Sequence, residues 1–402
     1  MKIVVIMPTY NEKENIGQMM EVLLKKEFPK ITQAEMHLLI VDDNSPDGTG
    51  EIVKQNLKKY KNLHLLTGPK KGLGYAYIRG MKYAMNEMKS DAVIEMDADF
   101  QHNPADVKRL VKAAKNADVV IGARYIKGGS VPKEWQFYRK FLSWFGNVFA
   151  RTVLFLPKIH DLTTGFRLTK VGYLSKINLD ILYGKASYAY KMHLLNLLLK
   201  EGAKVREVPI AFLPRLREKS KFKLRETIDT FLIVLRLRSR FIKFALVGGI
   251  GFIINAVGLE LFRNTSLTVN LAHLFPQTDS MHLKILAQPS FWAAAVAAEI
   301  AIFSNFNLDN LWTFEDVQIA SPLKYIRRFI KFNLASFGAI VIQSVVIAVG
   351  VIMFGDTLIV RQLSLVIAVG IFVIPYNYTM YNVFIWKRWS LRNVLAKISP
   401  LK

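Results

Sequence analysis

The sequence predicts an α/β domain followed by a helical membrane domain, and three observations carry this prediction. In the N-terminal part, short apolar runs typical of buried strands alternate with helical patterns. Such alternation is typical of a parallel sheet covered by helices. After about residue 240, four apolar segments of roughly membrane-spanning length follow one another. Clusters of basic residues flank these segments, as expected at a membrane surface.

The composition narrows the class of protein. A chain of 402 residues has room for two or three domains. Hydrophobic residues make up 51% of the chain, and the mean hydropathy of +0.21 is high for a soluble protein. The formal net charge of +24 suits nucleic acid or an anionic membrane surface. Because the long apolar runs favour the membrane and no base-stacking module is visible, we expect a lipid bilayer and no nucleic acid as partner.

Cysteine usage and the N-terminus exclude further classes. The chain has no cysteine, which excludes disulfides, thiolate metal ligands and a cysteine nucleophile. The apolar run at residues 3–7 is too short for a secretory signal, and Pro8 ends it. We therefore expect the N-terminal domain to stay in the cytosol.

Four candidate strands end in polar or glycine-containing segments. The strands are expected at residues 3–7, 37–41, 63–66 and 92–96. The segments that follow them are 8–12, 42–49, 70–74 and 97–101, with helices expected from about residue 14, after residue 49 and over 75–88. In a parallel sheet these carboxyl ends share one edge, where α/β proteins bind their ligands. The sequence therefore predicts a nucleotide-binding crevice at this edge.

The last of these strands leads into two carboxylates. Asp97 and Asp99 are separated by Ala98, and the amide of Gln101 follows. On an extended chain, side chains at i and i+2 point the same way, so both carboxylates can face one ligand. Hard oxygen donors suit Mg²⁺ or Mn²⁺. An isolated Asp-x-Asp pair also arises by chance on surface turns.

The other segments have simpler interpretations as well. Asp43, Ser45 or Asp47 could cap the helix that follows. The loop at 70–74 could be a solvated turn, because it matches neither a dinucleotide fingerprint nor a P-loop. Their common position at one sheet edge favours ligand binding.

Several ordered blocks give the chain a resemblance to a known family. Residues 8–12, 41–49, 71–74, 97–101, 122–125, 138–143, 161–168, 207–209 and 215–221 resemble successive blocks of the inverting family-2 glycosyltransferases of the GT-A fold. Within that family the chain is most similar to dolichol-phosphate mannose synthases, over about residues 1 to 230. It departs from the usual Gly-x-Ser-Lys pattern, which is Glu218-Lys219-Ser220-Lys221 here.

The resemblance implies transfer of mannose from GDP-mannose to dolichyl or polyprenyl phosphate, with Mg²⁺ or Mn²⁺ as cofactor. The implied metal ligands are Asp97, Asp99 and Gln101. The implied nucleotide-binding residues are Pro8, Tyr10, Glu12, Val41, Asp43, Asp97 and Ala98. The acceptor phosphate would be held by Arg124, Arg139, Ser143, Arg215 and Lys221, and catalysis is assigned to Asp99, Arg124 and Arg139. Because a phosphate monoester is already largely anionic near neutral pH, we expect no catalytic base.

Two segments predict helices at the membrane interface. In residues 137–156, aromatic and aliphatic side chains recur at helical spacing with basic residues between them. Residues 224–240 repeat the pattern and end in Arg236, Arg238 and Arg240. A core-facing helix is the alternative for residues 137–156.

The C-terminal part predicts four spans, near residues 241–262, 291–311, 332–354 and 363–385. Basic clusters at 236–243, 324–331 and 387–392 place the enzyme domain and the C-terminus in the cytosol by the positive-inside rule. The pattern resembles the GtrA-like membrane domain. We therefore expect a glycosyltransferase domain at 1–223, an interface helix or linker at 224–240 and a membrane domain at 241–402. Glu299 falls inside the second span, where a carboxylate marks function or pairs within the bundle.

Three other functions remain open. The same chemistry could use UDP-glucose and polyprenyl phosphate, because the motifs fix neither base nor hexose. A lipid-linked sugar transporter or flippase component could use the N-terminal domain only to sense nucleotide sugar. A processive polysaccharide synthase lacks support, because no Gln-x-x-Arg-Trp-type motif is visible.

Overall fold

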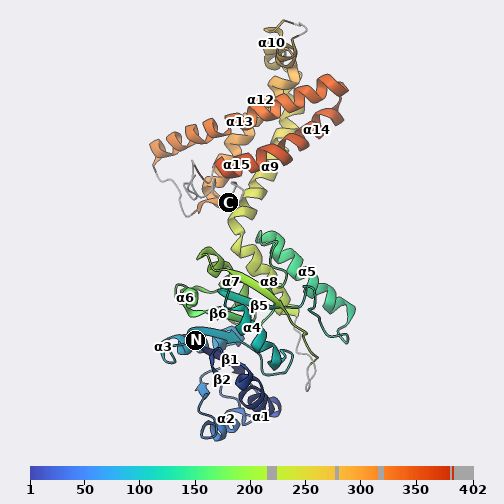
Figure 1. Ribbon diagram of the computed structural model, residues 1–402. Coiled ribbons are helices and arrows are strands. Elements are labelled where there is room, and N and C mark those ends of the chain that lie inside the picture. The colour runs from blue at the N-terminus through green and yellow to red at the C-terminus, as the bar shows by residue number, and fades with distance from the viewer. Residues whose placement is uncertain (215–223, 277–279, 316–320, 381–382, 384–402) are drawn as a thin grey trace. The chain divides into compact units, whose positions relative to one another are not determined.

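The computed structural model describes residues 1–214, 224–276, 280–315, 321–380 and 383. The chain forms two compact units, Met1–Arg238 and Ser239–Lys402. The first is built around a sheet, and the second consists of helices (Figure 1). Each unit is described by itself.

A sheet of seven strands runs through the first unit. Its strands are β1 (Lys2–Thr9), β2 (Glu35–Asp42), β3 (Leu63–Thr67), β4 (Ala92–Glu95), β5 (Val119–Ala123), β6 (Arg167–Lys170) and β7 (Val205–Pro209). The strand order is β3-β2-β1-β4-β6-β5-β7. The first four strands pair in parallel, as the alternating pattern predicts.

Strand β6 departs from the predicted parallel arrangement. It lies antiparallel between β4 and β5, with Glu95 opposite Arg167. The loop at 160–166 leads directly into β6. The chain therefore enters the sheet in the direction opposite to that of β4 and β5. The reversal brings that loop to the edge where β4 ends, because the first residue of β6, Arg167, lies opposite Glu95.

Helices cover both faces of the sheet. They are α1 (Lys13–Glu21), α2 (Thr49–Leu57), α3 (Leu73–Asn86), α4 (Val107–Ala113), α5 (Phe137–Val153), α6 (Val171–Leu174), α7 (Tyr190–Lys200) and α8 (Leu224–Leu237). In β1, Val5 packs in the core with α1, α2 and α4, and its neighbour Ile6 packs in the core with α3, α7 and α8. This alternation is the period of a strand buried on both faces.

Helix α8 belongs to the first unit. Its Phe231 ring lies 4.8 Å from the Phe149 ring of α5, measured between centroids. Ile233 and Val234 are buried in the core with α7. The segment expected to be an interface helix or linker therefore begins with a helix packed on the α/β domain.

Among its described residues, the second unit contains four helices long and apolar enough to cross a membrane, as predicted. They span Ser239–Phe262, Pro289–Thr313, Pro322–Phe354 and Leu358–Met380. The first is α9 (Ser239–Phe262), and the second joins α12 (Pro289–Leu308) to the π-helical η5 (Asp309–Thr313). The third is α13 (Pro322–Phe354), and the fourth joins α14 (Leu358–Ile367), the π-helical η7 (Ala368–Val373) and α15 (Ile374–Met380). Short helices α10 (Ser266–His273) and α11 (Met281–Leu286) lie between the first two spans.

Small residues let these helices approach closely. A Cβ added at Gly258 of α9 would lie 2.9 Å from the Cβ of Ala297 in α12. Close approach through small residues is the usual packing mode in membranes, where dispersion rather than burial holds helices together. A larger residue at Gly258 would separate α9 from α12.

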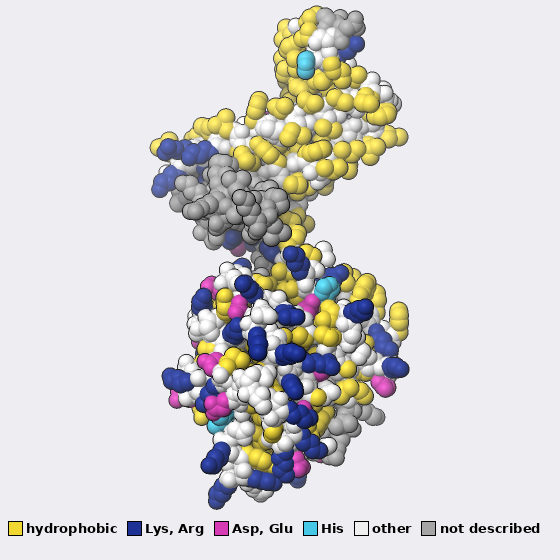
Figure 2. Space-filling model, in the orientation of Figure 1, with side chains coloured by type: hydrophobic (Ala, Val, Ile, Leu, Met, Phe, Trp, Pro, Cys, Tyr) yellow, Lys and Arg dark blue, Asp and Glu magenta, His cyan; other side chains and the backbone are white. Residues whose placement is uncertain are grey.

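Charge and apolar surface are unevenly distributed (Figure 2). Apolar side chains dominate the visible surface of the second unit, and Lys and Arg gather at the start of α13. In the first unit, Phe137, Phe141, Trp144 and Phe145 of α5 are between 40% and 83% exposed. Such an aromatic row exceeds the scattered apolar residues of ordinary surfaces. The core-facing alternative for α5 therefore holds only for its other face, which buries Asn147 and Ala150.

Candidate active site

The two carboxylates predicted as metal ligands lie where β4 ends. Asp97 and Asp99 follow the strand in a turn rather than on extended backbone, and Phe100 has a φ of +61°. Tyr77 of α3 donates a hydrogen bond of 2.6 Å to Oδ1 of Asp97. The backbone N of Gln101 donates to Oδ1 of Asp99 at 3.2 Å. The backbone therefore bends at residues 98–100, where the i and i+2 spacing predicted an extended strand.

The side chain of Gln101 also ties the turn to the end of the domain. Its Nε2 donates to the carbonyl of Leu213 at 3.4 Å. Within the described residues, no group of three or more His, Asp or Glu side chains could hold a metal ion. A metal here would thus depend on two carboxylates and one amide, with further oxygen ligands from a bound substrate.

A buried network of polar side chains from β4 and α7 lies next to this segment, and the sequence patterns did not identify it. Lys191 of α7 is 1% exposed, donates to the carbonyl of Gly165 at 2.9 Å and pairs with Glu95 at 3.2 Å. Tyr190 donates a hydrogen bond to the same Glu95 carboxylate. Burial lowers the pKa of Lys191, whereas the negative charges of Glu95 and Asp97 oppose that shift. The only sequence signal was an uncommon charged residue, Glu95, inside an apolar strand.

His102 supports the same turn from below. Its ring is 1% exposed, and its Nδ1 accepts a hydrogen bond from the backbone N of Asp97 at 3.2 Å. Burial lowers the pKa of His102 to about 4, so the ring is neutral at pH 7 and can accept that bond. A Cβ at Gly165 would come within 3.2 Å of His102 and 3.1 Å of Lys191. A side chain at position 165 would therefore require His102 or Lys191 to shift by a few tenths of an ångström.

The carboxyl end of β2 carries a second pair of acidic residues with different partners. Asp42 accepts from Thr9 at 2.9 Å and from the Ser45 hydroxyl at 2.6 Å, so it joins two loops. Asp43 accepts from Nη2 of Arg79 at 2.7 Å. Burial raises the pKa of Asp43, and the hydrogen bond and charge of Arg79 partly offset this shift.

The capping alternative for Asp43 is excluded. Helix α2 begins at Thr49, and it is Asp47 that accepts from the Thr49 backbone N at 2.9 Å. The Asp43 carboxylate points instead to α3 through Arg79. It thus lies at the carboxyl end of β2 and pairs with Arg79 rather than capping a helix.

One lysine of the loop after β3 contacts the neighbouring end of β1. Nζ of Lys70 lies 3.3 Å from the centroid of the Tyr10 ring, which follows β1. A cation over an aromatic face is attracted by the ring quadrupole. Tyr10, Asp43 and Lys70 therefore place an aromatic face, a carboxylate and a cation along neighbouring strand ends. Glu12 accepts from Asn15 at 2.8 Å, and Val41 is fully buried beneath this edge.

The family resemblance implies that Asp43 binds the nucleotide donor, and on that hypothesis we expect Arg79→Met to raise the KM for this donor by about tenfold, with a smaller change in kcat. Arg79 holds the Asp43 carboxylate by a charge-assisted hydrogen bond worth about 1.5–3 kcal/mol, and part of that orientation would be lost. Steady-state kinetics at varied donor concentration measure the effect. Lys82→Met on the same helix, which removes an exposed ion pair with Asp180, is the matched control. Equal KM values in both variants would contradict the assignment.

Arg124, at the end of β5, is engaged in a buried ion pair. Its Nε and Nη2 donate to the two oxygens of Asp161 at 2.7 and 2.8 Å, and Nη2 also donates to Thr163 at 2.6 Å. Burial would raise the pKa of Asp161, but the charge and hydrogen bonds of Arg124 outweigh it and lower that pKa. Glu207 of β7 accepts from the Asp161 backbone N at 2.8 Å. Arg124 therefore fixes the loop at 160–166.

Helix α5 carries the remaining described residues predicted for the acceptor. Arg139 and Ser143 are one turn apart, and the Arg139 guanidinium lies 4.0 Å from the centre of the Trp135 ring. Ser143 accepts from the Tyr125 hydroxyl at 2.6 Å. Arg215 and Lys221 lie outside the described residues.

Asn147, which the sequence patterns missed, anchors this helix. Its Oδ1 accepts from the backbone N of Leu162 at 2.8 Å, and its Nδ2 donates to Thr163 at 3.0 Å. It is 2% exposed. The one signal available was an amide on the otherwise apolar inner face of an amphipathic helix.

A sheet edge that carries carboxylates and a unit with four candidate membrane helices are the features expected of a membrane-bound glycosyltransferase, and the family comparisons agree. Residues 4–177 match the model of Glycosyl transferase family 2. Residues 243–386 match the GtrA/DPMS transmembrane domain. The sequence resemblance is therefore confirmed in both units, and the protein is an enzyme, a glycosyltransferase of the GT-A type.

Similar proteins extend the comparison to the whole chain. The Dolichol-phosphate mannosyltransferase of Pyrococcus furiosus is 31% identical over 92% of this chain and 97% of its own length. The Undecaprenyl-phosphate mannosyltransferase of Micrococcus luteus is 36% identical over 55% of this chain and 87% of its own length. The Polyprenol monophosphomannose synthase of Mycolicibacterium smegmatis is 36% identical over 52% of this chain and 77% of its own length. The chain belongs to the family of dolichol- and polyprenol-phosphate mannosyltransferases.

Proposed function

We propose that the protein transfers mannose from GDP-mannose to dolichyl or another polyprenyl phosphate at the cytosolic face of the membrane, giving dolichyl phosphate mannose and GDP. The observation that carries the proposal is the carboxylate turn Asp97 to Gln101 beside the Asp43–Arg79 pair at one sheet edge. All three relatives carry mannose and a polyprenyl lipid in their names. The bond between the mannose anomeric carbon and the diphosphate breaks, and a bond from that carbon to a lipid phosphate oxygen forms.

The donor would occupy the edge formed by β1, β2 and β4. Tyr10 offers a ring face for the base, and Asp43 offers a carboxylate for base or ribose hydrogens. Pro8, Glu12, Val41 and Ala98 complete the proposed nucleoside pocket. Lys70, whose ammonium lies over the Tyr10 ring, would be near a nucleotide bound there.

The residues present fit a divalent cation. Asp97, Asp99 and Gln101 supply hard oxygen donors of the kind that Mg²⁺ and Mn²⁺ prefer. When bound, such an ion would neutralise the charge that develops on the departing diphosphate. The chain itself fixes the donors, because Tyr77 and His102 hold Asp97 from two sides.

The acceptor phosphate would bind near basic residues of α5 and of the loops beside it. Arg139 and Ser143 share one face of α5, and a guanidinium suits bidentate phosphate binding. Because Arg124 is already paired with Asp161, we assign it a positioning role: it fixes the loop against which the lipid phosphate binds. Arg215 and Lys221 remain proposed phosphate ligands. No catalytic base is needed, since the phosphate arrives as an anion.

The aromatic row on α5 is proposed to hold the domain against the lipid surface. A chain of residues 1–238 should bind vesicles containing anionic lipid, and replacing Phe141, Trp144 and Phe145 by Ser should weaken that binding at least about tenfold. Flotation or sedimentation with vesicles measures it. The control replaces Leu57 and Ile181, apolar residues of this unit that are 36% and 53% exposed. Unchanged binding of the triple variant would contradict this role.

A panel of donors tests the proposed function. Membranes containing the protein, dolichyl phosphate and Mg²⁺ or Mn²⁺ are incubated with labelled GDP-mannose or with UDP-glucose. Labelled lipid from GDP-mannose supports the proposal. Product from UDP-glucose alone would support the same type of reaction with UDP-glucose, not GDP-mannose, as the donor. Binding of a nucleotide sugar without any lipid product would favour the transporter alternative.

A further inference from the structure

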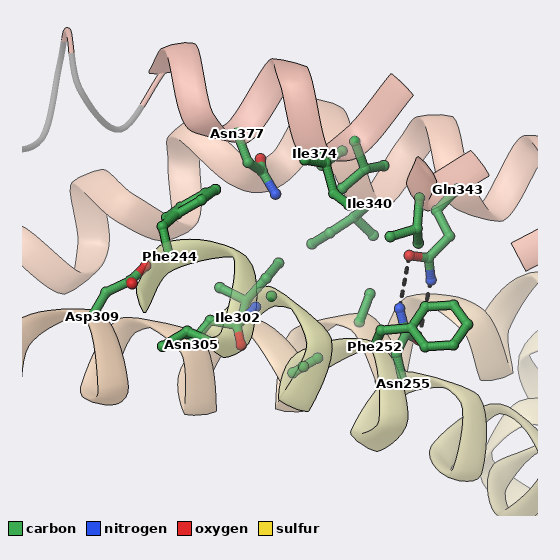
Figure 3. A pocket seen from close by; sticks show the side chains of 18 residues that line it. Phe244, Phe252, Asn255, Ile302, Asn305, Asp309, Ile340, Gln343, Ile374 and Asn377 are labelled. Carbon is green, nitrogen blue, oxygen red and sulfur yellow. Dashed lines mark hydrogen bonds between the residues drawn. The ribbon is translucent and has the colours of Figure 1, made fainter. Parts of the chain in front are cut away.

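The membrane unit contains a cavity between its four spanning helices. Its wall comes from α9, α12, η5, α13, η7 and α15, and its volume is about 70 Å³, room for several water molecules. Figure 3 shows that polar side chains gather at its two ends, with apolar residues such as Ile302 and Ile340 between them. The two ends differ in how their polar groups are satisfied.

One end is satisfied within the protein. Asn255 of α9 donates to Gln343 of α13 at 2.7 Å, and Gln343 donates back to Asn255 at 3.1 Å. Gln343 also donates to the Ala294 carbonyl at 3.4 Å. This reciprocal pair uses its amides on each other and needs no ligand.

The other end is not satisfied within the described part of the chain. Asp309 is 1% exposed, and neither of its carboxylate oxygens has a hydrogen-bond partner there. The Oδ1 atoms of Asn305 and Asn377 are buried and equally without partners in that part. In Figure 3 these three side chains project toward the same end of the cavity, from η5, α12 and α15. Four buried oxygen atoms, two from Asp309 and one each from Asn305 and Asn377, could therefore accept a hydrogen bond or bind a cation.

Every other carboxylate described in residues 239–380 has a partner. Glu260 and Asp356 pair with Arg361, and Glu315 pairs with Lys243 at 3.0 Å. Glu299, the residue singled out from the sequence, accepts a hydrogen bond from Asn333. None of the residues that line the cavity is Lys, Arg or His. Because a buried lone carboxylate costs several kcal/mol, the balancing positive charge must come from outside the described part of the chain, as a bound cation or a proton.

We propose that Asp309, Asn305 and Asn377 form a binding site for one small monovalent metal cation of the Na⁺ type. The carboxylate and amide oxygens are hard ligands. One negative charge balances one monovalent ion, whereas a divalent ion would leave a net positive charge in an apolar bundle. Asp309 opens the π-helical segment η5, and π-helical segments often occur at functional sites. The site is distinct from the glycosyltransferase crevice and does not depend on the proposed donor.

Equilibrium binding of ²²Na⁺ to the purified full-length protein in detergent tests the site. We expect saturable binding of one ion per chain, displaced by excess NaCl and not by choline chloride. Asp309→Asn should lower bound label at least tenfold. Glu299→Gln, the same charge change on the same span, should retain it. Glycosyl transfer by the same samples reports that each variant is folded.

A second measurement keeps the proposal testable without any variant. NaCl should raise the midpoint of thermal unfolding of the wild-type protein above that in choline chloride of equal ionic strength, because a ligand bound to the folded state stabilises it. Absence of saturable ²²Na⁺ binding, or binding unchanged by Asp309→Asn, would overturn the proposal. Either result would show that the carboxyl is satisfied by a proton or by water.

Discussion

Asp99→Asn is expected to lower the rate of glycosyl transfer by about a thousandfold, with the fold unchanged. The substitution keeps the side-chain volume and the hydrogen bond from the Gln101 backbone N, but removes one of two carboxylate charges at the end of β4. In the proposed reaction, these carboxylates would hold the cation that stabilises the charge of the departing diphosphate, which we expect to be the largest single contribution to the rate. Initial rates of labelled-lipid formation at saturating donor measure the loss.

The control for this variant is Asp106→Asn. Asp106 is 5% exposed and pairs with Arg109 at 3.1 Å, so it is a buried acidic residue of the same domain with a partner of its own. We expect it to keep most of the activity. If both variants retained wild-type rates, the carboxylate turn would not be the catalytic centre.

Asp161→Ala is expected to destabilise the first unit by about 3–5 kcal/mol, because it leaves the buried Arg124 guanidinium without its carboxylate. The loss should exceed that from an exposed ion pair such as Lys82 with Asp180. The midpoint of thermal unfolding of the full-length protein in detergent, compared with Asp180→Ala, measures it. A drop no larger than that of Asp180→Ala would contradict the role given to this pair.

The same pair gives a pH dependence with a defined sign. Because the pKa of Asp161 is lowered in the folded protein, its contribution is complete above the unfolded value of about 3.9. It is lost as the pH falls through the lowered pKa. The stability difference between wild type and Asp161→Ala should therefore shrink below about pH 4 and stay constant from pH 5 to 8.

The parts of the fold that follow local patterns were predictable from sequence. Buried parallel strands appear in the sequence as apolar runs, so β1 to β4 lie where expected. Helix α5 and the four candidate spans also lie near their predicted positions. The antiparallel β6 was not predictable, because its four residues carry no signal for direction. Direction is set by the loop at 160–166, which Arg124 and Glu207 hold in place.

In the candidate site, too, some residues could be predicted from local sequence patterns and others could not. Asp97, Asp99 and Asp43 follow strands, and strand ends meet at one edge, so their neighbourhood could be inferred. Their orienting partners, such as Tyr77, His102 and Lys191, come from helices and loops distant in sequence. Buried polar contacts of this kind depend on tertiary packing, which leaves no periodic signal in the chain. The sequence does place Asp309 inside the predicted second span, between Leu308 and Asn310, but its position at the cavity depends on tertiary packing.

Product stoichiometry tests the central claim most directly. Purified protein is supplied with GDP-mannose and dolichyl phosphate, and released GDP is counted against mannose found in lipid. We predict one GDP for each mannosyl lipid, one mannose per lipid, and an anomeric configuration inverted relative to the donor. GDP release without lipid product, or several sugars on one lipid, would contradict a single transfer to a lipid phosphate.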